Sequence, residues 1–482
     1  MHTASKLNIH SFLNLLGGVG SVLVYIATTP ILLKILGLDG FGVLSIIWIF
    51  LNITSVLDLG VGRAVSYELA RNKKIQEYAG GIIIISILFA FLQGTIIGIL
   101  FSLLSHHFST AFLSNFSSQE HSIMNLMGLI GLAIPFSIAS TILMLVLEGQ
   151  KRFISVNIYQ VFATTLVQAG PIIMFYLNAV DDVVEVIASA IILRIGAFFI
   201  LGLFVLWDPR TRRGLMPGTN ALRSLIKFGA KVQLSSLSEP VLDNADKFIL
   251  SSLIGPSAVA IYNIPFQIHS KLKLLPIALM RSIIPEIASL HTRDKQLALT
   301  EYGFILLVRI STPILLFFLV FYLIIMRYWL GDLEGEKVTQ IGIVLILGVW
   351  FNFIAHVPFG SLQGQGRPGS IAIVQVIQII PYLVLVLILV KLLGTQGAAI
   401  AWTIRAIVDS AILIRISGLR YSKLIQVIPH LIIFLLTWTL VFTQKNYELQ
   451  AIGYWGLGIL VVIYLAYSLT SLKNSFRRKS EL

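Results

Sequence analysis

Long apolar segments separated by short polar stretches recur along the whole chain. About twenty consecutive apolar residues are enough to cross a bilayer as a helix. Fourteen such segments can be drawn, at 11–33, 41–62, 82–104, 123–147, 153–178, 184–207, 227–253, 259–285, 301–326, 338–362, 370–391, 397–416, 425–443 and 451–472. The pattern predicts an all-α polytopic membrane protein with about 14 transmembrane helices. Because this number is even, both termini should lie on one side of the membrane.

The composition agrees with this class. The 482 residues are 57% hydrophobic and only 12% charged, whereas soluble proteins contain about 25% charged residues. The sequence has no cysteine, which excludes disulfides and thiolate metal sites. The polar N-terminus, residues 1–10, precedes an apolar run without a small-residue cleavage signal, so we expect a retained first helix and not a signal peptide.

The distribution of basic residues predicts the orientation in the membrane. Of the Lys and Arg residues in the predicted loops and tails, 21 lie on the side of Met1 and five lie on the other side. The positive-inside rule therefore places both termini in the cytoplasm. The same bias accounts for most of the net charge of +13, so we expect no nucleic-acid partner.

Three short similarities suggest an internal repeat. LEGQKR (147–152) resembles LQGQGR (362–367), residues 36–44 resemble 254–262, and AIILRI (190–195) resembles AWTIRA (401–406), all at offsets of 211 to 218 residues. We therefore predict an N-lobe of six helices (1–207), a cytoplasmic linker (208–226), a C-lobe of six helices (227–416), and two further helices with a cytoplasmic tail (417–482). Two parallel repeats of this kind suit alternating access, in which the lobes rock around a shared site.

Charged residues inside the predicted spans are the main candidates for function. Nine Lys and Arg residues lie within spans or at their ends: Arg194, Lys231, Lys247, Lys271, Lys273, Arg281, Arg309, Arg405 and Arg415. Each charge near the bilayer centre costs about 2.5–3.5 kcal/mol on insertion scales, so the deeper ones need a water-filled cavity or a partner. Residues near the cytoplasmic ends, among them Arg281 and Arg309, can instead extend to the headgroups.

These cations predict a lumen that binds anions. The predicted substrate-binding set is Arg194, Lys247, Lys271, Lys273 and Arg405, with Arg281 and Arg309 as further candidates. Some have an acidic residue four positions away, because Asp243 precedes Lys247 and Asp409 follows Arg405. Arg194, Lys271 and Lys273 have no such neighbour. Arg suits the forked geometry of phosphate and Lys provides a point charge, so a pyrophosphate is a natural target.

The acidic residues within spans are candidates for ion coupling. They are Asp58, Glu239, Asp243, Asp246 and Asp409. Close acidic groups raise one another's pKa, so protonation could be linked to transport, with proton or sodium as the coupling ion. Static pairing with the lumen cations is the alternative. We expect no cofactor and no metal site, and the sequence has no phosphate-binding loop of an ATPase.

Several motifs resemble one known family. ILGLDGFGVLSIIWIFLNITSVLDLGVGRAVSYELAR (35–71), DNADKFILSSLIGPSAVAIYNIPFQI (243–268), QGQGR (363–367) and LLGTQGAAIAW (392–402) resemble Wzx-type polysaccharide flippases of the MOP (MATE-like) superfamily. The resemblance implies two pseudo-symmetric six-helix lobes in a V, plus two C-terminal helices. It also implies a cationic central cavity, a character that we carry over to Arg194, Lys271, Lys273 and Arg405.

The resemblance further implies a function in lipopolysaccharide or polysaccharide biosynthesis. The expected activity is the flipping of an undecaprenyl-pyrophosphate-linked oligosaccharide (an O-antigen, capsule or exopolysaccharide repeat unit) to the outer leaflet of the bacterial inner membrane. Membrane lipid and the polymerase and chain-length regulator of the same pathway are the expected partners, and the chain is not expected to be an enzyme.

Other functions stay open on the sequence. A lipid II flippase shares the architecture, and a multidrug MATE-type exporter does too, although it favours an acidic lumen. A membrane glycosyltransferase or O-antigen polymerase generally has a larger outer loop than the longest one here, about Ser105–Ser122. Because helix 227–253 and its neighbour carry most of the charges, we expect the C-lobe to hold the phosphate and any coupling ion, with Arg194 facing them from the N-lobe.

Overall fold

The computed structural model describes residues 2–71, 79–112, 120–208, 238–443 and 464. These residues form helices and their connections, with no strand among them. The chain divides into two compact units, Met1–Ala260 and Ile261–Leu482. The helices of the first unit are α1 (His2–Val56), α2 (Val61–Arg71), α3 (Ala79–Phe112), α4 (Glu120–Gly149), α5 (Phe153–Tyr176), α6 (Val183–Trp207) and α8 (Ser238–Leu253).

The boundary between the units falls inside α9 (Pro256–Leu272). The helices of the second unit are α10 (Leu274–Ser289), α11 (Arg293–Leu330), α12 (Asp332–Gly364), α13 (Pro368–Leu393), α14 (Thr395–Ser417), α15 (Tyr421–Ile425) and α16 (Ile428–Thr443). The four-part division predicted from the sequence stays a prediction, because almost all of the linker 208–226 lies outside the described residues.

The expectation of an all-α membrane protein is confirmed. Ten of the described helices are long and apolar enough to cross a membrane. The predicted number of 14 stays a prediction, because α8, α9 and α10 have only 16, 17 and 16 residues and nearly all of segment 451–472 lies outside the described residues. In addition, the predicted spans 11–33 and 41–62 are joined in the single helix α1.

Glycine makes the bend that separates the two arms of α1. Gly37 has φ 67° and ψ 179°, a conformation outside the helical region, and a residue without Cβ adopts it at little steric cost. The second arm ends at Val56, earlier than the predicted end at residue 62. A short connection with Leu59 at φ 50° then leads into α2.

The predicted span 259–285 is broken in the structure. Helix α9 ends at Leu272 and α10 begins at Leu274, while the amide of Lys273 donates to the Ser270 carbonyl oxygen at 3.3 Å. Pro276 explains the break, because it has no N–H to donate to the carbonyl of Leu272. Lys273 therefore lies at a helix break and not within a continuous span, which corrects the prediction.

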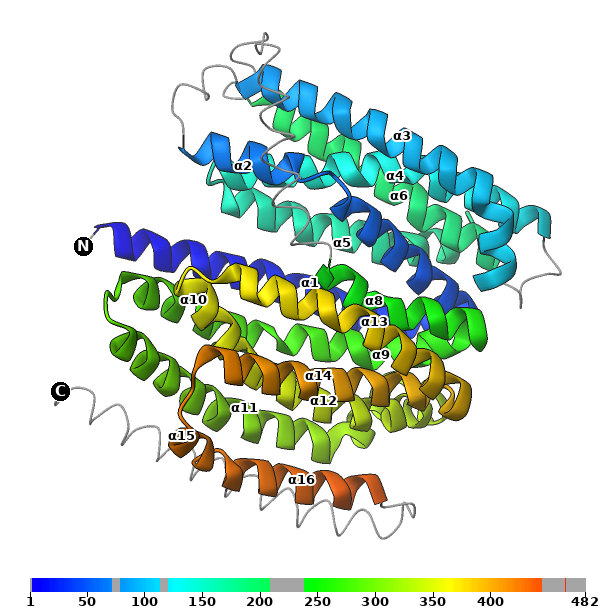
Figure 1. The fold of residues 1–482 in the computed structure, drawn as a ribbon. Helices are drawn as coiled ribbons and strands as arrows, with labels where there is room; N and C mark the ends of the chain where they lie inside the picture. Colours follow the sequence, from blue (N-terminus) through cyan, green and yellow to red (C-terminus); the bar gives the residue numbers. More distant parts are fainter. Residues whose placement is uncertain (1, 72–78, 113–119, 209–237, 444–463, 465–482) are drawn as a thin grey trace. The chain divides into compact units, whose positions relative to one another are not determined.

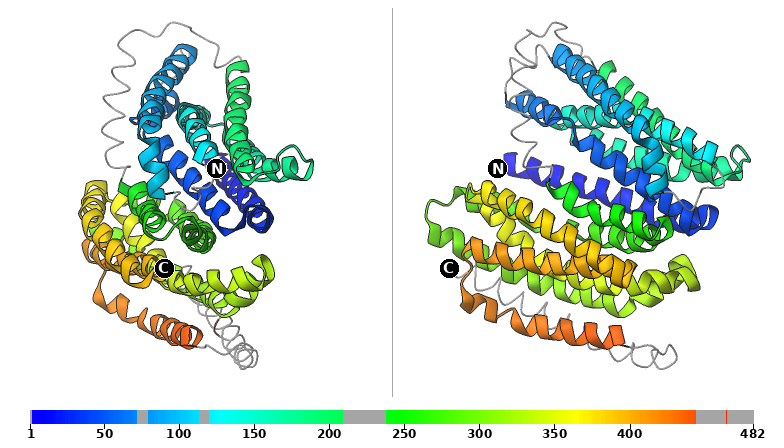
Figure 2. Two further views of the ribbon diagram at one scale, coloured as in Figure 1. Left: turned by 90° about the vertical axis from the view of Figure 1, so that its right-hand side faces the viewer. Right: turned by 45° about the vertical axis from the view of Figure 1, so that its right-hand side comes forward.

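In the first unit, α3 and α4 pack along their length, and α4 also contacts α6, α2 and α1 (Figures 1 and 2). Small residues allow the close approach of α3 and α4. A Cβ atom on Gly98 would collide with the carbonyl oxygen of Gly131, and one on Gly94 would collide with the backbone of Pro135. Helix α5 packs against α1 and α6, so α1, α4, α5 and α6 are neighbours.

In the second unit, α12 packs against α11 and α14, and α13 packs against α14. Two tryptophans are among its largest fully buried side chains, Trp350 and Trp402. The indole of Trp350 donates to the Thr312 hydroxyl at 3.0 Å, and the Thr403 hydroxyl donates to the Val344 carbonyl at 3.1 Å. Polar groups in this core are thus bonded across α11, α12 and α14, which ties the three helices together.

Candidate functional site

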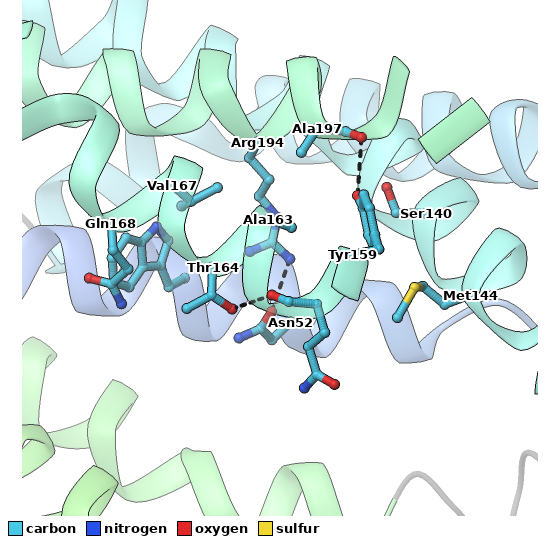
Figure 3. Close-up of a pocket in the computed structure, with 12 residues that line it drawn as sticks. Asn52, Ser140, Met144, Tyr159, Ala163, Thr164, Val167, Gln168, Arg194 and Ala197 are labelled. Carbon is cyan, nitrogen blue, oxygen red and sulfur yellow. Dashed lines mark hydrogen bonds between the residues drawn. The ribbon is translucent and has the colours of Figure 1, made fainter. Parts of the chain in front are cut away.

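A polar pocket lies among α1, α4, α5 and α6 of the first unit. Its volume is about 410 Å³, within the range of about 300–1,000 Å³ that is usual for small-molecule sites. Figure 3 shows the side chains that line it, which are Trp48, Asn52, Ser140, Met144, Tyr159, Gln160, Ala163, Thr164, Val167, Gln168, Arg194 and Ala197. Arg194 is the only charged residue among them.

Arg194, a predicted lumen cation, extends from α6 into this pocket (Figure 3). The side chain is half-buried. Its Nη2 donates to Asn52 Oδ1 at 2.9 Å and its Nε donates to Ser137 Oγ at 3.3 Å. Both partners are neutral, and the structure describes no carboxylate in an ion pair with Arg194. The guanidinium is therefore oriented without being neutralised.

Two of the hydroxyl groups in the pocket donate their hydrogens to backbone carbonyl oxygens. Tyr159 donates to the Ala197 carbonyl oxygen at 3.1 Å, and Thr164 donates to the Gln160 carbonyl oxygen at 2.7 Å. The Tyr159 hydroxyl also bonds to the Ser140 side chain, whereas the Thr164 oxygen keeps lone pairs that can accept a further hydrogen bond. The pocket thus offers acceptors as well as the cationic donor Arg194.

Two further polar groups that line the pocket can form additional hydrogen bonds. The indole Nε1 of Trp48 is buried and has no hydrogen-bond partner among the residues that the structure describes. Gln168 is 7% exposed, and its Oε1 lies 3.3 Å from the Thr28 hydroxyl. Because an indole N–H can only donate, this group is available to a ligand that carries an acceptor.

Sequence analysis missed the neutral members of this site. Gln160, Thr164 and Gln168 are spaced four residues apart in the otherwise apolar segment 153–178, and this spacing places them on one face of a helix. Trp48 and Asn52 have the same spacing on α1. Polar residues at helical spacing, and not only charged ones, are therefore the signal by which both groups could have been found.

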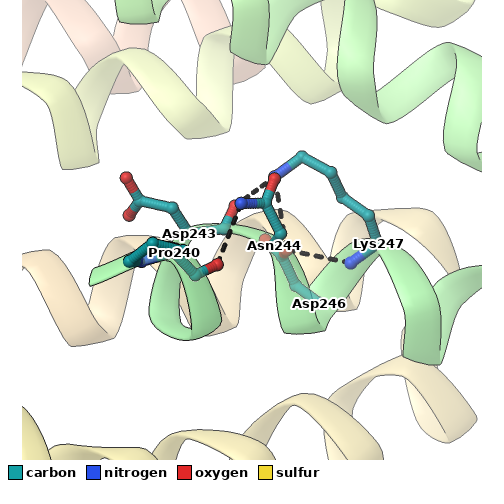
Figure 4. A network of polar contacts seen from close by, with 5 residues as sticks. All are labelled: Pro240, Asp243, Asn244, Asp246 and Lys247. Atoms are coloured by element: carbon teal, nitrogen blue, oxygen red, sulfur yellow. Dashed lines mark hydrogen bonds and ion pairs between the residues drawn. The ribbon is translucent and has the colours of Figure 1, made fainter. Parts of the chain in front are cut away.

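The structure adds an adjacent carboxylate to the predicted pairing of Lys247. The ion pair that is described joins Lys247 Nζ to Asp246 Oδ1 at 3.4 Å, and the same carboxylate accepts the Lys247 amide at 2.8 Å (Figure 4). Asp243, the partner expected from spacing, contributes its backbone carbonyl oxygen to Lys247 Nζ. Asp246 and Lys247 are 0% and 1% exposed, so these two candidates form a buried pair. The Glu239 side chain lies outside the described residues.

The remaining lumen candidates belong to the second unit. Lys271 is half-buried at the end of α9, with no hydrogen bond or ion pair described for it. Lys273 lies at the break before α10. Arg281 is exposed and Arg309 is half-buried. Whether these cations share a lumen with Arg194 stays a prediction.

Arg405 and Asp409 both contact α13. The Arg405 guanidinium lies over the Tyr382 ring, 5.0 Å from its centroid, a distance typical of a cation–π interaction. Asp409 Oδ1 accepts a hydrogen bond from Gln378 Nε2 at 2.8 Å. The structure therefore adds aromatic and amide partners to the pairing expected from the spacing of these two residues.

Asp58 has a structural explanation. Its carboxylate accepts the amides of Gly60 and Gly62, both at 2.9 Å, which caps the first turn of α2. The side chain is 4% exposed and lies outside the candidate spans Gly18–Ser55 and Gly80–Ser105. Burial raises the pKa of Asp58 above its ordinary value, against the opposite effect of the two amide hydrogen bonds. Within the described ranges, no cluster of three His, Asp or Glu residues could hold a metal ion.

Comparison with known proteins agrees with the sequence resemblance. Residues 10–291 match the family described as "Polysaccharide biosynthesis protein". A Shigella flexneri protein named "Putative O-antigen transporter" is 26% identical over 415 residues, which cover 84% of this chain and 96% of that protein.

Solved structures share the fold at low sequence identity. The lipid II flippase MurJ, in an inward closed conformation, is similar with a TM-score of 0.72 at 14% identity, covering 97% of this chain and 99% of that one. An inward-facing multidrug resistance MATE family transporter of the MOP superfamily has a TM-score of 0.66 at 15% identity, covering 87% and 98%. At such identities the similarity concerns the fold alone.

Proposed function

The chain belongs to the polysaccharide biosynthesis protein family, and we propose that it is a flippase for a lipid-linked oligosaccharide in the bacterial inner membrane. The substrate would be an undecaprenyl-pyrophosphate-linked repeat unit of O-antigen, capsule or exopolysaccharide, moved from the inner to the outer leaflet. The name of the Shigella flexneri relative supports an O-antigen type of cargo. Both termini would lie in the cytoplasm, as the basic residues predict.

The observation that carries the proposal is the pocket around Arg194. A cation inside a membrane span costs about 2.5–3.5 kcal/mol even on insertion scales, and the described partners of Arg194 carry no negative charge to offset this cost. An anionic substrate entering the pocket would supply that charge. A protein that only packed helices together would gain nothing from such an arrangement.

The proposed transport cycle is alternating access. Two six-helix halves would expose a cationic cavity first to the cytoplasmic leaflet and then to the outer leaflet, while the lipid tail stays in the bilayer. The cations Lys271, Lys273 and Arg405 would hold the pyrophosphate. Coupling to protons or sodium through Asp243 or Asp409 is part of the proposal, and no covalent chemistry is needed.

A lipid II flippase is the second candidate, because MurJ shares the fold of this chain over nearly its whole length and the sequence left this cargo open. A multidrug exporter is less favoured, since a pocket whose only charge is an arginine suits anions better than cationic drugs. Complementation separates the first two. Rescue of cells depleted of MurJ would favour lipid II, whereas rescue of surface glycan in cells lacking an O-antigen flippase favours the proposed function.

The test uses the second type of cell. Arg194→Ala should lower surface glycan by about tenfold or more, the effect of losing a charged hydrogen-bonding group, while protein abundance stays normal. Lys34→Ala is the matched control, because Lys34 is an exposed cation of the same unit outside the pocket. Wild-type surface glycan in the Arg194→Ala strain would refute the role of the pocket. Failure of the wild-type protein to support any surface glycan would refute the flippase proposal itself.

A further inference from the structure

We propose that the pocket around Arg194 holds a carboxylate-bearing sugar, of the hexuronic acid type, within the transported oligosaccharide. This inference rests on the proposed flippase function and makes it more specific. It assigns the pocket in the first unit to the glycan, so that the pyrophosphate must be held elsewhere. Charge, hydrogen-bonding capacity and the unpaired indole each point to this ligand.

The charge of the pocket matches a single carboxylate. Arg194 is the only ionisable cation among the twelve lining residues. Its guanidinium has five N–H donors, of which the described hydrogen bonds to Asn52 and Ser137 use two. The remaining three donors are enough for a bidentate pair with a carboxylate. A pyrophosphate carries at least two negative charges and would leave one of them without compensation here.

The acceptors in the pocket discriminate further between the two ligands. The hydroxyl hydrogen of Thr164 points to the Gln160 carbonyl oxygen, so toward the pocket this group presents lone pairs. An ionised pyrophosphate has only acceptor oxygens and cannot bond to lone pairs. Sugar hydroxyls both donate and accept, so a pyranose ring can donate to the Thr164 oxygen, which a pyrophosphate cannot do.

The donors in the pocket also suit hydroxyl groups. Trp48 Nε1 is a buried donor without a partner among the described residues, and an indole N–H can only donate. Gln168 is more than nine-tenths buried, and its amide can both donate and accept. A ring with several hydroxyls could bond to both groups. A carboxylate without a sugar ring would bond to Arg194 and have no further group for Trp48 and Gln168.

Binding of three soluble probes to the purified full-length protein tests the inference. The probes are methyl β-glucuronide, methyl β-glucoside and inorganic pyrophosphate, measured by saturation-transfer NMR in detergent. The glucuronide should bind about tenfold or more tightly than the glucoside, because only the glucuronide forms the charged hydrogen bonds to Arg194. Arg194→Gln should abolish this preference, because the affinity for the glucuronide should fall to that for the glucoside.

A second pair of variants tests the acceptor argument. Thr164→Val should weaken both sugars several-fold. Thr165→Val should change neither, because Thr165 donates to the carbonyl four residues earlier as Thr164 does but does not line the pocket. An unchanged melting temperature would show that each variant is folded. Equal loss in both variants would overturn the acceptor argument.

Two results would overturn the inference as a whole. Pyrophosphate binding that displaces the glucuronide and is lost in Arg194→Gln would assign the pocket to the phosphate. Equal affinity of the wild-type protein for the two glycosides, or no binding of either, would refute the proposal that the pocket binds an acidic sugar. In both cases the surface-glycan assay still decides the flippase function separately, because it does not depend on which part of the substrate Arg194 contacts.

Discussion

Removing one partner of the buried Asp246–Lys247 pair should destabilise the protein far more than removing both. The two side chains are 0% and 1% exposed, so neither charge can be compensated by bulk water. In Lys247→Met the Asp246 carboxylate loses the cation beside it, and in Asp246→Asn the Lys247 ammonium loses its neighbouring anion. In the double variant Asp246→Asn with Lys247→Met both charges are gone.

The expected magnitudes follow from this burial. Breaking a buried pair on one side costs about 3–5 kcal/mol, whereas replacing both partners by neutral groups is often close to neutral. A domain of about 150–250 residues loses roughly 2–4 °C of melting temperature per kcal/mol. Each single variant should therefore melt about 10 °C below the wild type, and the double variant should recover most of this loss.

Thermal unfolding of the purified protein in detergent, followed by intrinsic fluorescence, measures the three shifts. The surface-glycan assay on the same variants separates stability from transport. If the double variant is stable and transports normally, the pair is structural and neither residue couples an ion. A stable double variant without transport would instead support a role in coupling.

Additive small effects would refute the reasoning. Single variants that each cost less than about 1 kcal/mol and sum in the double variant are typical of an exposed ion pair. That result would mean that water reaches the pair, as in the lumen predicted from the sequence. Because the cycle compares four forms of one protein, it does not depend on the absolute free energy of unfolding.

Three further predictions follow from the same structure. Asp58→Ala should cost about 1 kcal/mol by uncapping α2, and Asp58→Asn should cost less because its one amide oxygen keeps one of the two hydrogen bonds; surface glycan should stay at the wild-type level in the folded Asp58→Asn protein, and its loss would support ion coupling through Asp58. Gly98→Ala should lower the melting temperature by forcing α3 and α4 apart at a cost of about 1–3 kcal/mol, whereas Gly128→Ala, which meets open space, should not; equal melting temperatures would contradict the close packing. Lys271→Ala should abolish surface glycan at normal protein abundance, and full activity would remove Lys271 from the proposed pyrophosphate site.

The sequence predicted the helical class and the placement of most helices, because a span needs only length and low polarity. The break at Lys273 was not predicted. Its cause, Pro276, lies within an apolar run whose hydropathy gives no sign of it, and the same is true of the early end of α1 at Val56. Hydrophobicity alone therefore does not predict where a helix breaks or ends.

The candidate site was predicted in part. Arg194 was found because a charge in a span is conspicuous, whereas Gln168 and Asn52 are neutral and cost little to bury when they are hydrogen-bonded. Spacing suggested Asp243 as the partner of Lys247 but not Asp246, with which the structure describes an ion pair, since a flexible lysine side chain can fold back onto an adjacent carboxylate. Which side chains meet depends on rotamers and neighbouring helices that spacing does not specify.

The contrast between Arg194 and Lys247 gives the strongest reason to place substrate recognition at Arg194. Both are cations in the first unit, and both donate hydrogen bonds to neighbouring groups. Lys247 is fully buried beside a carboxylate, so its charge is already matched and an incoming anion would have to displace Asp246. Arg194 is held by an amide and a hydroxyl, which orient the guanidinium but leave its charge and three of its donors for a ligand. Asn52→Asp would place a carboxylate beside Arg194 and neutralise its charge, as Asp246 does for Lys247. The fold should tolerate Asn52→Asp, while anion binding and surface glycan are lost.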